Sequence, residues 1–396
     1  MAAESGVAIR PLATVAGVTD PAATDATALD RLVTYDDFRE AARLRLTPAA
    51  YDYYVSGALT EWTLRENEAA FRRWRFHKRV LVDVSTIDTT TTVLGTEMPF
   101  PVLVAPTAFH RLADPEGELA TARATQALGS VMVASTLATT SLEDIAATGV
   151  TRWFQLYVQK DRGFTRELIA RAMASGYTAI VLTVDTPFIG IRYSEMRNRF
   201  QLPEGLTLAN FGAGLVAGGS GAGRDSASGL RAFSEQFDQT LDWRDLEWLC
   251  GECGGVGLPV VAKGILTDID ARRAVDAGVA GVVVSNHGGR QLDGDPATLD
   301  ALPEVVDEVG GDTEVLLDGG VRTGPDVVKA LALGARAVLV GRPVLWGLAA
   351  GGQAGVERVL SLLRDEVADT LRQAGVPRLA DLGPGLLRPA TSTASG

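Results

Sequence analysis

The sequence predicts an α/β fold of the (β/α)8 TIM barrel class, on three observations. Eight apolar runs have the length and the β-branched composition of buried parallel strands. Most are separated by segments of helical periodicity, which favours a parallel sheet. Eight such units in 396 residues favour a sheet that closes on itself. The runs are 100–105, 131–134, 153–157, 179–184, 259–262, 281–284, 315–317 and 337–340.

The segments outside the strands set the expected domain limits. Residues 1–30 are rich in Ala, Thr, Pro and Gly without periodicity, which predicts a flexible leader. The segments after Thr34 and Thr47 begin with acids or with proline, so each predicts the start of a helix. We expect a single barrel domain over 31–385 and a flexible tail over 386–396.

The connection between the fourth and fifth predicted strands, residues 203–240, is too long and too rich in glycine for a simple helix. On a barrel this connection leaves the carboxyl end of a strand, so one interpretation is a mobile lid over the active site. A plain disordered insertion fits the composition equally well.

Composition excludes some classes of partner. The net charge of −12 argues against nucleic acid and anionic membranes, because phosphates would be repelled over most of the surface. An anionic ligand therefore needs a local cluster of arginines. No apolar run approaches membrane-spanning length and the N-terminus lacks a signal peptide, so we expect a cytoplasmic protein.

Cys250 and Cys253 have the spacing of a zinc or redox motif. Two thiolates alone do not close a tetrahedral zinc site, and neither a second pair nor a histidine stands beside them. We therefore interpret the pair as incidental and expect no metal site.

Polar or basic residues follow all eight predicted strands, at the end where barrels place their chemistry. Some of these polar residues could be ordinary turn residues. Chance does not readily explain a polar residue after all eight strands, with a cation or a base after four of them. The residues are Thr107, Ser135, Gln155 with Tyr157, Thr183 with Asp185, Lys263, Ser285 with His287, Asp318 to Arg322, and Gly341 with Arg342.

One of these exits, residues 285–293, carries His287 and Arg290 on either side of two glycines. The glycines allow a sharp turn or the close approach of a ligand. The plain alternative is an ordinary turn with a hydrogen-bonded core histidine. The position at a strand exit favours a base and an anion clamp on one loop.

The last two exits predict a phosphate site. Gly319, Gly320 and Gly341 expose backbone N–H groups, and Arg322 and Arg342 add positive charge, after the seventh and eighth strands. Barrels commonly hold a phosphate at these two loops. A phosphorylated cofactor or substrate is therefore expected.

Several motifs in the same order resemble the FMN-dependent α-hydroxy acid oxidase and dehydrogenase family, the glycolate oxidase and lactate oxidase group. The resemblance covers residues from about 34 to 380. It rests on YDYYVSG (51–57), APTA (105–108), FQLY (154–157), LTVDTP (182–187), AKG (262–264), SNHGGRQLD (285–293), LDGGVR (317–322) and GRP (341–343).

The resemblance implies roles for the reacting groups. His287 is implied to be the base, and Asp185 to pair with its imidazole and stabilise the protonated form. Lys263 is implied to lie at the flavin N1–C2=O edge, where it offsets developing negative charge.

The resemblance also implies how the substrate and FMN are held. Arg192 and Arg290 grip the substrate carboxylate, and Tyr53 and Tyr157 hydrogen-bond the substrate. The other FMN contacts implied are Pro106, Thr107, Ala108, Ser135, Gln155, Thr183, Ser285, Asp318, Gly319, Gly320, Val321, Arg322, Gly341 and Arg342.

Departures from the family pattern refine the expected activity. Leu137 stands where short-chain glycolate oxidases carry Trp, which implies a wider, more apolar pocket. Phe109, Phe188 and the glycine-rich insertion also differ from the glycolate oxidases, which argues against glycolate as the best substrate. Ala108 is typical of the oxidases rather than the dehydrogenases. We expect a homotetramer or homo-octamer that oxidises a medium-chain or aromatic (S)-2-hydroxy acid with oxygen, giving hydrogen peroxide.

Two alternatives remain at this point. One is a dehydrogenase or monooxygenase of the same fold, with another acceptor or outcome. The other is a barrel that binds a phosphorylated ligand without redox chemistry.

Overall fold

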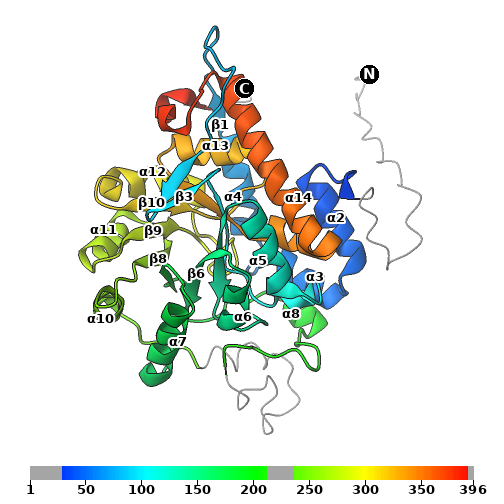
Figure 1. The fold of residues 1–396 in the computed structure, drawn as a ribbon, viewed down its shortest axis with the longest axis vertical. Coiled ribbons are helices and arrows are strands. Elements are labelled where there is room, and N and C mark those ends of the chain that lie inside the picture. Colours follow the sequence, from blue (N-terminus) through cyan, green and yellow to red (C-terminus); the bar gives the residue numbers. More distant parts are fainter. Residues whose placement is uncertain (1–28, 212–235, 391–396) are drawn as a thin grey trace, which may run out of the picture.

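The computed structural model describes residues 29–211 and 236–390. At its centre is a closed barrel of eight parallel strands, which confirms the predicted fold (Figure 1). The last strand pairs with the first, with Val340 opposite Val104. The strands are β4 (Val102–Val104), β5 (Val131–Ser135), β6 (Thr151–Leu156), β7 (Ile180–Thr183), β8 (Val260–Ile265), β9 (Gly281–Val284), β10 (Glu314–Leu317) and β11 (Ala337–Val340).

Helices follow the strands and surround the barrel (Figure 1). The longest, α14, is kinked at Gly351 and Gly352. These helices are η1 (His110–Leu112), α5 (Gly117–Ala127), α6 (Leu142–Ala147), α7 (Arg162–Ala174), α8 (Tyr193–Asn198), α10 (Trp243–Gly254), α11 (Asp268–Asp276), α12 (Thr298–Val309), α13 (Gly324–Ala332), α14 (Arg342–Ala374), η2 (Leu379–Asp381) and η3 (Pro384–Leu386).

Three helices precede the barrel: α2 (Tyr35–Arg45), α3 (Pro48–Val55) and α4 (Trp62–Arg72). The two predicted helix starts are confirmed. Thr34 accepts a hydrogen bond from the N–H of Asp37, whose carboxylate accepts one from the N–H of Thr34, and Thr47 caps α3. Helix α2 packs against α14, which brings this N-terminal unit onto the barrel (Figure 1).

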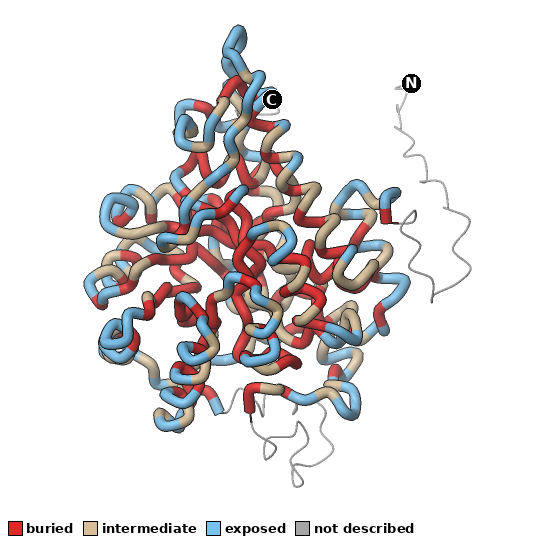
Figure 2. Tube along the Cα trace, viewed as in Figure 1, coloured by how far each residue is buried: buried red, intermediate tan, exposed pale blue. Residues whose placement is uncertain are grey.

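A hairpin of β2 (Thr91–Val93) and β3 (Thr96–Met98) covers the amino end of the barrel. Its Val93 and Met98 pack in the same cluster as the inward-facing barrel residues, and Glu314 at the start of β10 accepts a hydrogen bond from the N–H of Leu94 at 3.0 Å. Buried residues fill the centre of the molecule (Figure 2). With its amino end plugged, the barrel offers its carboxyl end for a ligand site.

The prediction of a flexible tail over 386–396 is wrong for its first residues. Residues Leu387–Pro389 form β12, which pairs antiparallel with β1 (Trp74–Phe76), and Leu387 is buried. A three-residue strand is too short to show periodicity, and its partner lies some three hundred residues earlier in the chain. Residues 391–396 lie outside the described residues.

Two other predicted segments fall largely outside the described residues. Residues 1–28 of the predicted leader lie outside the described residues, and Leu29, the first described residue, is buried. Residues 212–235 of the predicted lid also lie outside the described residues, so neither interpretation of that insertion is tested. Its described flanks are ordered: Asn210 accepts a hydrogen bond from the N–H of Leu142, and Phe237 pairs with Gln159 in an isolated β-bridge.

The two cysteines lie in α10 as free thiols. Burial raises the pKa of Cys250 to about 11 and that of Cys253 to about 12, so both stay protonated at neutral pH. Within residues 29–211 and 236–390 no group of His, Cys, Asp or Glu could hold a metal ion. Over the same ranges no helix has the length and apolarity to cross a membrane.

Candidate active site

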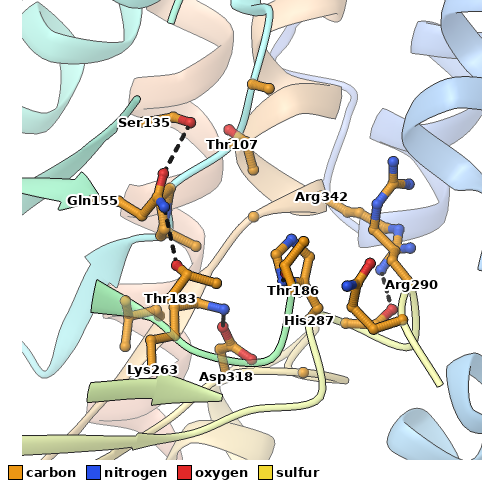
Figure 3. Close-up of a pocket in the computed structure, with 18 of the residues that line it drawn as sticks. Thr107, Ser135, Gln155, Thr183, Thr186, Lys263, His287, Arg290, Asp318 and Arg342 are labelled. Carbon is orange, nitrogen blue, oxygen red and sulfur yellow. Dashed lines mark hydrogen bonds and ion pairs between the residues drawn. The ribbon is translucent and has the colours of Figure 1, made fainter. Parts of the chain in front are cut away.

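A pocket opens at the carboxyl ends of the barrel strands (Figure 3). All the predicted site residues line it except Asp185 and Ser285. These two instead hydrogen-bond with lining residues, Asp185 with His287 and Ser285 with Lys263. The fold therefore brings together residues from all eight strand exits and from α3.

His287 lies on the loop after β9 in a left-handed backbone conformation with φ of 58°. Gly288 and Gly289 continue this conformation, with φ of 63° and 73°, which residues other than glycine rarely adopt. Asn286 fixes the loop, because its amide exchanges two hydrogen bonds of 2.8 Å with Asn67 of α4. The turn therefore presents the imidazole to the pocket.

The Nδ1 atom of His287 lies 2.9 Å from Oδ1 of Asp185, as the sequence predicts. Thr186 donates to the same carboxylate oxygen at 2.8 Å and lies beside the imidazole (Figure 3). Because Asp185 engages Nδ1, Nε2 is the ring nitrogen left to exchange a proton with a ligand.

The environment keeps Asp185 ionised. Burial alone would raise its pKa, but the charge and hydrogen bond of His287, the charge of Lys263 and the hydroxyl of Thr186 outweigh burial and lower it. An ionised carboxylate here stabilises a protonated imidazole. His287 can therefore accept a proton from a substrate and hold it.

Arg192 and Arg290 both flank the ring of Tyr53, with guanidinium carbons 5.9 and 5.0 Å from the ring centroid. Arg290 donates through Nη1 to the carbonyls of Tyr53 and Ser56, at 2.6 and 2.9 Å. Burial, and then the charge of Arg290, lower the pKa of Arg192 to about 10. The two neighbouring cations form a site for an anionic group such as a carboxylate.

Aromatic and aliphatic side chains form another part of the lining. Tyr157 stacks on Phe237 with ring centroids 4.5 Å apart, and Leu137 and Ile189 also face the pocket. Burial raises the pKa of Tyr53 and Tyr157, so both phenols keep their protons at neutral pH. The pocket thus combines phenol donors with an apolar wall.

A row of hydrogen bonds crosses three adjacent strand ends (Figure 3). Ser135 donates to Oε1 of Gln155 at 3.2 Å, and Nε2 of Gln155 donates to the hydroxyl of Thr183 at 3.0 Å. All three side chains are buried. Their mutual bonds fix the orientation of the Gln155 amide, which is available to a planar polar ligand.

Lys263 is a buried cation with two anchors. Its Nζ lies 3.0 Å from Oδ2 of Asp318 and donates to the hydroxyl of Ser285 at 2.9 Å (Figure 3). Burial would lower the pKa of Lys263, but the charges of Asp318 and then Asp185 outweigh burial and raise it. The ammonium is therefore charged where it faces the pocket.

The loops after β10 and β11 build an electropositive end. Arg342 donates to the carbonyls of Tyr54, Gly288 and Ser56, at distances between 2.9 and 3.1 Å. Burial, followed by the charges of Arg290 and Arg322, lowers the pKa of Arg342 to about 9. An anion at this end would relieve the repulsion among the three arginines.

Comparison with known proteins assigns this constellation to a family. Residues 42–389 match the family of FMN-dependent dehydrogenases. The chain belongs to this family. This match confirms the resemblance inferred from the sequence motifs and identifies the cofactor as FMN.

Individual relatives cover nearly the whole chain. An L-lactate oxidase of Nostoc sp. is 50% identical over 367 residues, which are 91% of this chain and 99% of the relative. A glycolate oxidase of Arabidopsis thaliana is 51% identical over 348 residues, 87% of this chain and 93% of the relative. A solved structure of mandelate oxidase with (S)-4-hydroxymandelic acid superposes with a TM-score of 0.85 at 43% identity, covering 90% of this chain and 99% of that one.

The pocket of this member of the family fits the cofactor. Arg322 and Arg342, with Gly319 and Gly320 at φ of 91° and 80°, suit a phosphate. Oδ1 of Asp318 is buried and has no hydrogen-bond partner within the described part of the chain, as expected of an acceptor aimed at a polar ligand. Bound FMN would supply the electron acceptor for the substrate.

Several pocket residues escape prediction from sequence. Thr186 and Gln291 directly follow predicted residues, which is the only signal that could find them. Phe237 lies near the end of the glycine-rich insertion 203–240 and carries no signal. Of the family departures, Leu137 lines the pocket, whereas Phe109 is buried in the core behind Tyr53 and the side chain of Phe188 is exposed. Neither phenylalanine lines the pocket.

Proposed function

We propose that this enzyme oxidises an (S)-2-hydroxy acid to the 2-oxo acid and passes the electrons to oxygen, giving hydrogen peroxide. One observation carries the proposal: His287, paired with Asp185, lines the same pocket as two arginines and a buried lysine. The reaction removes two electrons and two protons from the carbinol carbon and its hydroxyl. Oxygen takes up both electrons and both protons.

The pocket residues divide this work. Arg192 and Arg290 hold the substrate carboxylate, which places the neighbouring carbinol carbon beside His287. Tyr53 and Tyr157 hydrogen-bond the substrate, and Asp185 stabilises the imidazolium formed when His287 takes a proton. The (S) configuration is supported by a similar solved structure, a mandelate oxidase variant with (S)-mandelic acid, at 43% identity.

We propose that the side chain of the substrate is medium-chain or aromatic. Leu137, Ile189 and Phe237 give the lining an apolar wall without an indole. The mandelate oxidase with (S)-4-hydroxymandelic acid, which holds an aromatic acid, supports the same assignment.

Leu137→Trp is expected to reverse the order of substrates. The indole would occupy the space that a long side chain needs, while a two-carbon acid still fits between His287 and the arginines. In the wild type each buried methylene of the substrate contributes about 0.8 kcal/mol, so kcat/KM should rise with chain length. The measurement is kcat/KM for a series from glycolate to mandelate.

Leu137→Met, which conserves volume, is the matched control and should keep the wild-type order. A wild type that already prefers glycolate, or a Trp variant with unaltered ranking, would show that Leu137 does not limit side-chain size.

Oxygen as acceptor is supported by Ala108, which lines the pocket, and by the oxidase names of the relatives. A chimera of (S)-mandelate dehydrogenase is also similar, with a TM-score of 0.83 at 39% identity, so the acceptor needs its own test. The purified yellow protein should bleach anaerobically with a 2-hydroxy acid. In stopped flow, oxygen should then restore its colour quickly and with stoichiometric hydrogen peroxide.

Slow recovery with oxygen but rapid recovery with a quinone would identify a dehydrogenase. Colour recovery with substrate decarboxylation would identify a monooxygenase, and protein that no 2-hydroxy acid bleaches would refute the redox assignment.

We also propose that the chain acts in the cytoplasm as a homotetramer or homo-octamer. Free cysteines support a reducing compartment. Exposed apolar side chains such as Phe188, Met196 and Leu292 support contact between copies.

A further inference from the structure

A carboxylate lies behind the two arginines of the substrate site. Glu195 is on α8, whose N-cap residue is Arg192, and its Oε1 lies 2.7 Å from Nε of Arg192. The same oxygen lies 3.6 Å from Nη2 of Arg290. The side chain of Glu195 is only 13% exposed, and those of Arg192 and Arg290 are 6% and 14% exposed. Glu195 is not among the residues that line the pocket.

The three side chains form a unit with a net charge of +1. Burial and the charge of Arg290 lower the pKa of Arg192, and the charge of Glu195 acts in the opposite direction. Glu195 therefore favours the charged form of Arg192. A substrate carboxylate brings the charge of the unit to zero.

We propose that Glu195 is a specificity-determining residue that limits the site to monocarboxylic 2-hydroxy acids. The inference rests on the proposed function, because it assigns the substrate carboxylate to Arg192 and Arg290. Glu195 acts through its charge and through Arg192, without touching the substrate.

The physical reason is electrostatic. In a partly buried site, a unit charge within several ångströms changes the binding of another charge by about tenfold or more. Glu195 disfavours any bound carboxylate, but the arginines outweigh this for the first one. A second carboxylate finds no further unpaired cation in the unit and meets Glu195 as well. A dicarboxylic acid is therefore rejected.

The apolar wall contributes separately to this rejection. A second carboxylate placed against Leu137 or Phe237 loses water without gaining a partner. Glu195→Gln isolates the electrostatic part, because glutamine keeps the size and polarity of the side chain while it removes the charge.

The experiment measures the binding of butanoate and butanedioate to the oxidised holoenzyme by calorimetry, at a pH where all carboxyls are ionised. The two acids match in chain length and differ in charge, and neither carries a hydroxyl to be oxidised. The wild type should bind butanoate more tightly. In Glu195→Gln the ratio of the two dissociation constants should shift towards butanedioate by about tenfold or more.

Two control variants separate charge from structure. Glu195→Asp keeps the charge and should keep the wild-type preference. Glu143→Gln removes the same charge from an exposed ion pair with Arg171, whose atoms lie 2.8 Å apart, and should change neither constant. If Glu195→Gln does not retain FMN, Glu195→Met removes the charge without an amide and is measured in its place.

An unchanged ratio in the uncharged variants would overturn the proposal, as would an equal weakening of both acids, which would show that Glu195 only holds Arg192 in place. Because the measurement needs no turnover, these outcomes are distinct from failure of the proposed function. An enzyme that 2-hydroxy acids bleach, but whose Glu195→Gln variant keeps the wild-type ratio, refutes this inference alone.

Discussion

His287→Ala is expected to keep FMN bound and to slow reduction of the flavin by substrate by at least about 10²-fold. The imidazole supplies the base, and Asp185, which lies 2.9 Å from its Nδ1, does not itself line the pocket. Removing the imidazole therefore leaves no base of this pair at the substrate. The FMN contacts from the other strand exits remain. Anaerobic stopped-flow absorbance with a saturating 2-hydroxy acid measures the rate.

His77→Ala is the matched control, because His77 is exposed and lies outside the pocket lining. Among residues 29–211 and 236–390 its hydrogen bond is made by its backbone N–H, to the carbonyl of Leu386. This variant should reduce at the wild-type rate. Near-normal reduction of His287→Ala would refute the assignment of the base, and loss of FMN from it would assign His287 to the cofactor instead.

Lys263→Met is expected to produce the second large effect, a loss of FMN occupancy or a strong slowing of flavin reduction. Lys263 is the ion-pair partner of Asp318, and both side chains are less than 10% exposed. Breaking a buried pair by removing one partner costs about 3 to 5 kcal/mol, because the other charge stays buried. Reduction would also lose a fixed cation that offsets negative charge on the flavin.

The measurements are the ratio of flavin to protein absorbance after purification and the anaerobic reduction rate. Lys329→Met is the control, since Lys329 is half-buried on α13 and donates to the carbonyl of Phe71, away from the pocket. Unchanged FMN occupancy together with an unchanged rate for Lys263→Met would show that the lysine has no role at the flavin.

Sequence periodicity was sufficient to predict the barrel, because a strand buried on both faces leaves an uninterrupted apolar run such as 281–284. The strand exits then followed from topology, since all eight carboxyl ends of a parallel barrel meet at one face. The strand β12 escaped because its pairing with β1 joins distant segments that are each too short to show a pattern.

The contacts of two further residues could not be predicted from the sequence, for a different reason. Glu195 lies three residues after Arg192, a spacing common on any charged helix, and only the fold brings Arg290 to the same carboxylate. Phe237 reaches Tyr157 across a long insertion whose length hides their proximity. Contacts that depend on how loops return to the barrel leave no local signal in the sequence.

The docking of α3 has a further consequence for how the protein loses activity. Arg290 and Arg342 each donate to main-chain carbonyls at the end of this helix, and both substrate arginines lie against the ring of Tyr53 on α3. The anion sites are thus assembled between the barrel and the three N-terminal helices, α2 to α4. Local opening of these helices requires less free energy than global unfolding, and it would dismantle the substrate site while the eight-stranded sheet stays intact.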